Sequence, residues 1–323
     1  MNILITGSEG NIGKFLVRDI KAAYPGAVLV RVSGRQKIKS AGKNDLVYGG
    51  DLCDAALVKK IFTENKIDYV IHAAGYPYHP EFSLSRPFTV LSNDLMMLAN
   101  VLQQCAQIKK FIYLSSATVY ESVKDEMLRE QPAVELPFPQ SAYGQAKYLG
   151  EQLLNAYSRQ YGINYTIWRL FNVVSPYESH QGGGGHVFVD FYRKIFMARM
   201  PEIKIFGNGK QIRCFTWAED VTAALAGFLT DAKTDKEIFN LGSSEQKNLL
   251  ALIDLYLALG KSQKLLPEDY APKIITGETF AAVDTQVRIP DVSKAHQILG
   301  WNAKTDFENC FKQFITYKSS HAD

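Results

Sequence analysis

Tyr143 and Lys147 stand four residues apart in the run SAYGQAK, which begins at residue 141. On an α-helix this spacing places a phenol and an ammonium on one face. A free tyrosine titrates near pH ~10, and a neighbouring cation favours its ionised form, so Tyr143 could carry a proton at neutral pH. Because an ordinary exposed helix can show the same spacing, the pair needs support from other motifs.

A glycine-rich turn near the start of the chain gives that support. The run GSEGNIG at residues 7–13 follows a strand-like segment and opens a helical one. Glycines at such a turn allow the backbone to approach a pyrophosphate at the helix amino terminus. We expect a dinucleotide to contact Gly7, Gly10, Asn11, Ile12 and Gly13. A turn that packs closely and binds nothing is the alternative.

The end of the second expected strand bears on the choice of dinucleotide. An NAD site usually has an acidic residue there to bind the ribose 2′-hydroxyl, and this chain has none. Arg31, Ser33 and Arg35 could instead bind a 2′-phosphate. The sequence therefore favours NADP over NAD, with solvated arginines as the alternative.

Small and polar residues after later strands complete the expected cofactor site. Small side chains allow close approach of the ligand, and polar ones can hold its ribose and adenine. The candidates are Asp51 and Leu52 beside the adenine, Ala73, Ala74 and Gly75 beside the ribose, and Asn93 near the nicotinamide.

An α/β fold must position these residues. The first half alternates short apolar runs with amphipathic stretches, as a parallel sheet with crossover helices requires. Strands are expected at residues 3–6, 28–32, 69–72, 111–115 and 165–169, and helices at residues 11–23, 55–64, 90–106 and 142–161. We predict a Rossmann-type doubly wound parallel sheet, whose ligand crevice opens at the carboxyl ends of the strands.

The pattern changes after Asn172. Glycine-rich segments and shorter helical stretches follow, including four consecutive glycines at residues 182–185. We expect a dinucleotide-binding domain at residues 1–172 and a smaller C-terminal substrate-binding lobe at residues 173–323, some of whose segments, such as residues 239–241, return to the first domain.

Composition excludes several classes of protein. The 323 residues are 46% hydrophobic, enough for a full core, and carry 36 basic and 33 acidic side chains, for a net charge of +3. No overall field favours nucleic acid or a membrane surface. The four cysteines lack metal-ligand spacing, so no metal site is expected, and they suit reduced thiols of a cytoplasmic protein. Because a strand-like segment follows Met1 directly, no signal peptide is expected.

Taken together, the motifs resemble the extended short-chain dehydrogenases/reductases that act on nucleotide sugars, the NAD-dependent epimerase/dehydratase family. The motifs that match in order and spacing lie at residues 7–13, 51–52, 72–74, 115–120, 143–147, 169–172 and 213–216. The resemblance implies that Tyr143 is the acid/base and that Lys147 is its partner and a ligand of the cofactor ribose. It also implies that Ser116 bonds the reacting sugar oxygen.

The two residues after Ser116 bear on the reaction type. Dehydratases of this family usually carry Asp-Glu there and sugar-acid decarboxylases Ser-Glu, whereas this chain has Ala117 and Thr118. The run SSATVY is similar to that of the sugar 4-epimerases, so a nucleotide-sugar 4-epimerase is the leading interpretation. Because the sequence favours NADP, an NADPH-dependent reductase of a nucleotide 4-keto(-6-deoxy) sugar is the alternative. A non-catalytic dinucleotide-binding regulator is more remote.

The resemblance also implies substrate contacts for a nucleotide-diphosphate sugar. These are Thr118, Asn172, His186, Val187, Arg213 and Arg288. His186 occupies the region where related epimerase-reductases place an acid histidine, although their cysteine base would align with Thr118. Family members commonly form homodimers through two helices, here residues 90–106 and 142–161, with Met96, Met97, Leu149 and Leu153 as candidate contacts.

Overall fold

A seven-stranded parallel sheet forms the centre of the computed structural model, which describes residues 1–34, 42–75, 80–178, 186–278 and 287–321. The strand order is β12-β7-β5-β4-β1-β2-β3. The strands are β1 (Asn2–Thr6), β2 (Val28–Ser33), β3 (Asp45–Gly49), β4 (Tyr69–His72), β5 (Lys110–Ser116), β7 (Asn164–Leu170) and β12 (Glu237–Leu241). The predicted Rossmann-type sheet is confirmed. The sequence did not predict β3, a short edge strand.

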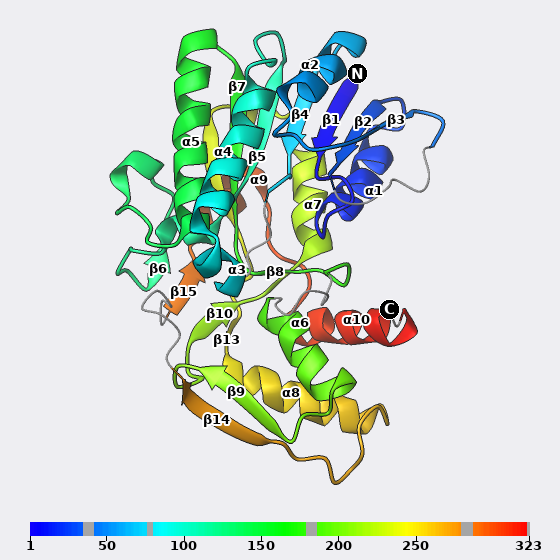
Figure 1. The fold of residues 1–323 in the computed structure, drawn as a ribbon, viewed down its shortest axis with the longest axis vertical. Coiled ribbons are helices and arrows are strands. Elements are labelled where there is room, and N and C mark those ends of the chain that lie inside the picture. The colour runs from blue at the N-terminus through cyan, green and yellow to red at the C-terminus, as the bar shows by residue number, and fades with distance from the viewer. Residues whose placement is uncertain (35–41, 76–79, 179–185, 279–286, 322–323) are drawn as a thin grey trace.

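Helices cover both faces of this sheet (Figure 1). Successive residues of β1 point to opposite faces, so Ile3 and Ile5 enter one core and Leu4 the other. The first core is closed by α1 (Gly13–Ala23), α7 (Ala218–Gly227) and α9 (Ser293–Leu299). The second is closed by α2 (Ala55–Glu64), α4 (Pro87–Leu102) and α5 (Ala142–Tyr161).

Local capping explains where two of these helices begin and end. The Oγ of Ser141 accepts a hydrogen bond from the N–H of Gly144 at 3.0 Å, and α5 ends at Gly162 with φ of 74°. Helix α4 begins at Pro87, earlier than expected, because proline suits the first turn of a helix.

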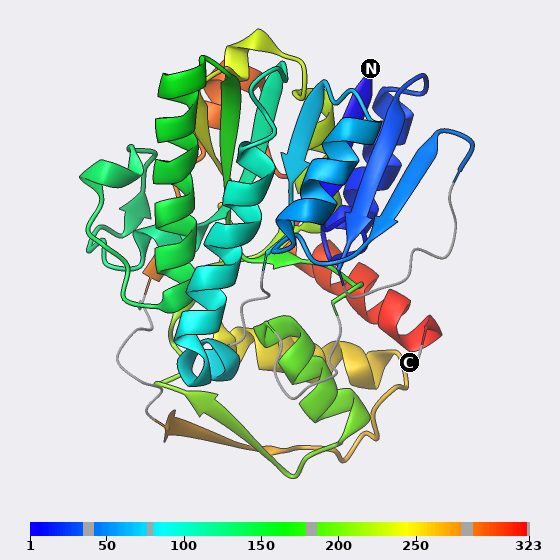
Figure 2. The same ribbon diagram turned by 45° about the horizontal axis from the view of Figure 1, so that its top comes forward.

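A second lobe lies beside the carboxyl ends of the central strands (Figure 2). Its elements are α6 (Val187–Tyr192) with a π-helical extension (Arg193–Met197), α8 (Leu249–Ser262), α10 (Phe307–Ser320) and the paired strands β9 (Glu202–Phe206) and β14 (Lys273–Glu278). An aromatic core holds it together: the rings of Tyr256 and Phe311 meet edge to face, with centroids 4.3 Å apart.

Several short elements complete the described fold. They are β6 (Met127–Leu128), β15 (Val287–Pro290), β10 (Ile212–Cys214) and β13 (Gln246–Asn248) in one sheet, β8 (Val173–Val174) paired with β11 (Thr216–Trp217), helix α3 (Pro80–Ser85), and 3₁₀ turns at Ala117–Tyr120, Ala133–Glu135 and Ala232–Thr234. Strand β12 pairs with β7 in the central sheet, so the chain returns to the first lobe after residue 172. The division near residue 172 remains a proposal.

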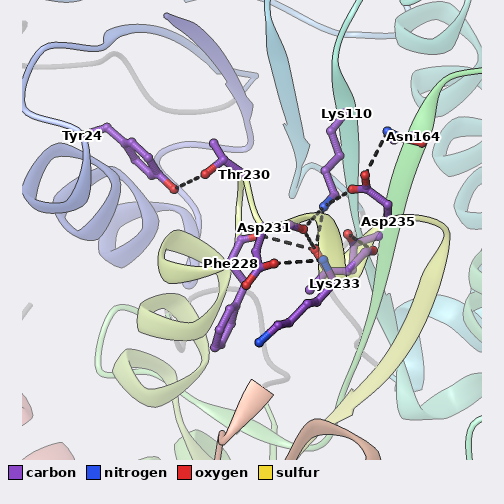
Figure 3. Close-up of polar contacts among 10 residues, drawn as sticks. Tyr24, Lys110, Asn164, Phe228, Thr230, Asp231, Lys233 and Asp235 are labelled. Carbon is purple, nitrogen blue, oxygen red and sulfur yellow. Dashed lines mark hydrogen bonds and ion pairs between the residues drawn. The ribbon is translucent and has the colours of Figure 1, made fainter. Parts of the chain in front are cut away.

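A buried lysine fixes this return at the amino ends of the strands (Figure 3). Lys110, at the start of β5, donates from Nζ to the carbonyl oxygen of Asp231 at 2.8 Å and pairs with Asp235 at 2.6 Å. Asp235 also accepts a hydrogen bond from Asn164 of β7 at 3.0 Å. The contact therefore links β5, β7 and the segment that leads into β12.

Candidate active site

A cavity of about 890 Å³, called the central cavity below, opens between the two lobes at the carboxyl ends of the central strands. Most of the residues expected from the sequence line it: Gly7, Gly10, Asn11, Ile12, Gly13, Ser33, Asp51, Leu52, Ala73, Ala74, Gly75, Ser116, Thr118, Tyr143, Lys147, Asn172, His186, Val187, Arg213 and Arg288. Arg31 and Asn93 do not line the described part of the cavity, and Arg35 lies outside the described residues.

The glycine-rich turn forms a backbone cradle, and two of its positions require glycine. Gly7 has φ of 67°, and a Cβ there would lie 2.8 Å from the carbonyl oxygen of Ala73. A Cβ on Gly13 would lie 2.1 Å from the carbonyl oxygen of Gly7. The bare backbone leads directly into the amino terminus of α1, where unpaired N–H groups favour an anion. This cradle fits the pyrophosphate of a dinucleotide.

Tyr143 and Lys147 occupy the first two turns of α5. The residues just before this helix are hydrogen-bonded to the side chain of Glu121. The carboxylate of Glu121 accepts the backbone N–H of Gln140 at 3.1 Å and that of Ser141 at 2.8 Å. The Nζ of Lys147 then lies 5.6 Å from the ring centroid of Tyr143. Cation and phenol therefore share one wall of the central cavity.

Lys147 carries a buried positive charge. Its Nζ donates to the carbonyl oxygen of Leu114 at 3.4 Å and lies 3.9 Å from Oδ2 of Asp94. Burial lowers the pKa of Lys147, but electrostatic interactions with Tyr113, Tyr143 and Asp94 outweigh it, so this pKa stands above its usual range. Lys147 stays protonated beside the phenol. The sequence did not reveal that Asp94 of α4 faces Lys147.

Ser116 ends β5 and caps the following 3₁₀ turn. Its Oγ accepts the N–H of Thr118 at 3.2 Å, which leaves its own hydroxyl hydrogen to donate elsewhere. Among the described residues, Oγ1 of Thr118 is buried without a hydrogen-bond partner, and this residue lines the central cavity. A buried polar atom of this kind suits a ligand contact.

Arg31 is buried beside the glycine-rich turn and does not line the described part of the central cavity. Its guanidinium pairs with Glu9 of the glycine-rich turn and with Asp45 of β3, the latter at 2.7 Å. Lys21 of α1 reaches the same carboxylate of Asp45 at 2.7 Å. The sequence predicts that Arg31 contacts a 2′-phosphate. In the structure its guanidinium contacts two carboxylates, because β3 brings Asp45 next to β2.

Two arginines of the second lobe stand next to each other. Arg213 of β10 and Arg288 of β15 are register partners on parallel strands, and both are 9% exposed. Neighbouring positions on parallel strands place both side chains on one face of the sheet, and both line the central cavity. Two cations in a cavity wall suit an anionic ligand.

His186 begins α6 and belongs to a pair that the sequence did not reveal. Its Nδ1 lies 2.7 Å from Oε1 of Glu178, which also accepts the N–H of His186 at 2.8 Å. The Glu178 carboxylate raises the pKa of His186. On the opposite wall, Asn172 has φ of 38° at the end of β7 and donates to the carbonyl oxygen of Cys214 at 3.0 Å.

The described residues contain neither a metal-binding cluster nor a membrane-spanning helix. Within the described ranges, no group of three or more His, Cys, Asp or Glu side chains could hold a metal ion. In the same part of the chain, no helix is both long enough and apolar enough to cross a membrane.

Comparison with known proteins agrees with the geometry. The family model described as "NAD dependent epimerase/dehydratase family" matches residues 3–242. UDP-glucose 4-epimerase of Caenorhabditis elegans is 26% identical over 95% of each chain, and dTDP-D-glucose 4,6-dehydratase of Homo sapiens is 26% identical over 98% of this chain and 89% of the relative. The crystal structure of UDP-glucose 4-epimerase with UDP-glucose from Thermotoga maritima is 27% identical, with a TM-score of 0.84 over 99% of both chains.

The resemblance inferred from the motifs is confirmed by this match, which spans most of the first lobe and part of the second. Relatives in the family are enzymes that act on nucleotide sugars. The chain belongs to the NAD dependent epimerase/dehydratase family.

Proposed function

We propose that the protein is a nucleotide-sugar epimerase that inverts C4 of the sugar, with Tyr143 as its proton carrier. The observation that carries this proposal is the buried charge of Lys147 beside Tyr143, in one cavity with Ser116 and the glycine cradle. Similarity to UDP-glucose 4-epimerases, one of them solved with UDP-glucose, supports it.

Each residue would have a distinct task. A bound nicotinamide dinucleotide supplies reversible hydride transfer at the sugar carbon. The cradle from Gly7 to Gly13 would hold its pyrophosphate. Tyr143 would take the proton of the sugar hydroxyl and return it, with the charge of Lys147 stabilising the phenolate in between. Ser116 would donate a hydrogen bond to the same sugar oxygen.

The absence of a carboxylate at positions 117 and 118 supports epimerisation over loss of water. Ala117 and Thr118 offer neither a general acid nor a base. Of the carboxylates that line the central cavity, Glu121 accepts two backbone N–H groups, and Glu178 accepts one and pairs with His186. The hydroxyl of Thr118, which has no hydrogen-bond partner among the described residues, suits a sugar hydroxyl instead.

Arg213 and Arg288 support a diphosphate-bearing substrate. Their guanidinium groups come from paired strands of the second lobe and line the cavity that contains Tyr143. Two adjacent cations match the charge of a diphosphate bridge. Asn172, His186 and Val187 remain proposed contacts to the rest of the substrate.

The alternative is an NADPH-dependent reductase of a nucleotide 4-keto(-6-deoxy) sugar. His186 favours it, because a histidine charged through Glu178 at the cavity wall could act as a second acid. Cofactor stoichiometry separates the two. An epimerase consumes no dinucleotide, whereas the reductase consumes one NADPH for each product.

For the cofactor we propose NAD, which revises the preference for NADP drawn from Arg31, Ser33 and Arg35. Arg31 is already paired with Glu9 and Asp45, so its charge is not available as an extra cation for a 2′-phosphate.

Mass spectrometry of nucleotides released on denaturation tests the cofactor, and monitoring NADPH during turnover tests the reaction. Released NAD with no NADPH consumption would support the proposal, whereas NADPH oxidation matched to product would favour the reductase.

We further propose a homodimer formed through α4 and α5, which lie side by side (Figure 1). Met96 on α4 is 47% exposed and is available to a partner. Met97, also expected at this contact, is buried in the core of its own subunit, so we do not include it in the proposed dimer contact. Light scattering that finds a monomer at micromolar concentration would contradict the dimer.

A further inference from the structure

We propose that Glu9, in the glycine-rich turn, replaces the carboxylate missing from the end of β2 and selects NAD against NADP. It would do so by accepting a hydroxyl of the adenosine ribose. This inference rests on the proposed function only in requiring that a nicotinamide dinucleotide binds the glycine cradle.

The turn holds Glu9 against the end of β2. Ser8 donates from its N–H to the carbonyl oxygen of Val32 at 3.1 Å and from its Oγ to the same oxygen at 3.3 Å. Glu9 consequently lines the central cavity in the same region as Ser33 and Gly34. This is the strand end where the ribose of a dinucleotide is bound in related folds.

The carboxylate of Glu9 is oriented by Arg31. The Nη2 of Arg31 donates a hydrogen bond to Oε1 of Glu9. The side chain of Arg31 is 9% exposed and that of Glu9 is 15% exposed. Within the described residues, Oε2 of Glu9 has no hydrogen-bond partner of its own. A fixed carboxylate with one oxygen available is a suitable acceptor for a ribose hydroxyl.

Two carboxylates contact the guanidinium of Arg31 among the residues that the structure describes. Glu9 is one of them, and Asp45, which also pairs with Lys21, is the other. Burial alone would raise the pKa of Asp45, but hydrogen bonds from Lys21 and Arg31 outweigh burial and lower this pKa below its usual value. The carboxylate therefore remains ionised. A 2′-phosphate would meet the negative charge of Glu9 before it could reach Arg31.

Direct titration tests the inference without any measurement of turnover. Full-length protein freed of bound nucleotide is titrated with NAD and, separately, with NADP by calorimetry. We expect NAD to bind at least about tenfold more tightly than NADP, the size of one hydrogen bond to a charged group. Glu9→Gln, which keeps the side-chain size, should remove most of this preference. Glu9→Ser is a second variant in case the first does not fold.

Asp45→Asn is the matched control. It neutralises a carboxylate on the same guanidinium, but Asp45 lies outside the described lining of the central cavity. It should change the ratio of the two affinities by less than about threefold. An equal effect of both variants, an unchanged ratio in Glu9→Gln, or tighter binding of NADP by the original protein would overturn the inference. Failure to bind either dinucleotide would contradict the proposed function as well.

Discussion

The carboxylate of Asp94 lies 3.9 Å from the ammonium of Lys147, and both side chains are at most 8% exposed. The pair joins α4 to α5 beneath the central cavity. A buried ion pair of this kind fixes both the position and the charge of the lysine. We therefore propose Asp94 as a positioning residue that acts on Tyr143 through Lys147.

Asp94→Asn should lower kcat about tenfold and affect KM less, because the substrate does not contact Asp94. Burial would then lower the pKa of Lys147 with less opposition. The alkaline limb of the pH profile should therefore move to lower pH. In a Lys147→Met background, the same change should have no further effect on the rate. An unshifted pH profile would contradict this role.

Thr118→Val should separate binding from stability. Removal of a buried hydroxyl without a protein partner costs the fold little, so the free energy of unfolding should change by less than about 0.5 kcal/mol. If the hydroxyl binds the sugar, KM should rise about tenfold.

Thr6→Val provides the comparison for this experiment. The hydroxyl of Thr6 is equally buried, but it contacts His72 at 3.1 Å and accepts the N–H of Ala74 at 3.1 Å. Its loss should cost about 1–2 kcal/mol in urea denaturation. If Thr118→Val destabilised the protein as much as Thr6→Val while KM stayed constant, Thr118 would have a structural role only.

Lys110→Met tests the contact that returns the chain to the central sheet (Figure 3). The lysine is 3% exposed and bonds Asp231, Thr234 and Asp235, so its loss should cost about 2 kcal/mol of unfolding free energy. Lys109, next in the chain, is 63% exposed, and Lys109→Met should change stability by less than about 0.5 kcal/mol. Equal effects of the two substitutions would contradict this account.

His186 should make stability depend on pH. Its folded pKa is raised by Glu178, so its contribution is fully present below the unfolded value of about 6.5 and is lost as pH rises through the folded value. Because the side chain is 43% exposed, His186→Gln should cost only about 0.5 kcal/mol at acidic pH and less at alkaline pH. Glu178→Gln should abolish this dependence. A cost of His186→Gln that did not vary with pH would refute the pairing.

The sequence predicted features that depend on local spacing. Gly7 and Gly13 follow a strand and open a helix, and Tyr143 and Lys147 share a helix face, so near neighbours in the chain define both motifs. Features that depend on packing between distant segments were not predictable. The residues of β2 do not reveal that β3 brings Asp45 beside Arg31. Likewise, the contact between Asp94 and Lys147 depends on how α4 packs against α5.

The account rests most directly on Tyr143 as a proton carrier in an enzyme that regenerates its own cofactor. Proton NMR of a panel of nucleotide sugars, incubated with the purified protein and no added NADPH, measures this. We predict that at least one sugar is converted to its C4 epimer, and that Tyr143→Phe lowers the rate at least about a hundredfold while the fold is retained. Full turnover by Tyr143→Phe, or conversion of a 4-keto sugar only when NADPH is supplied and consumed, would contradict it.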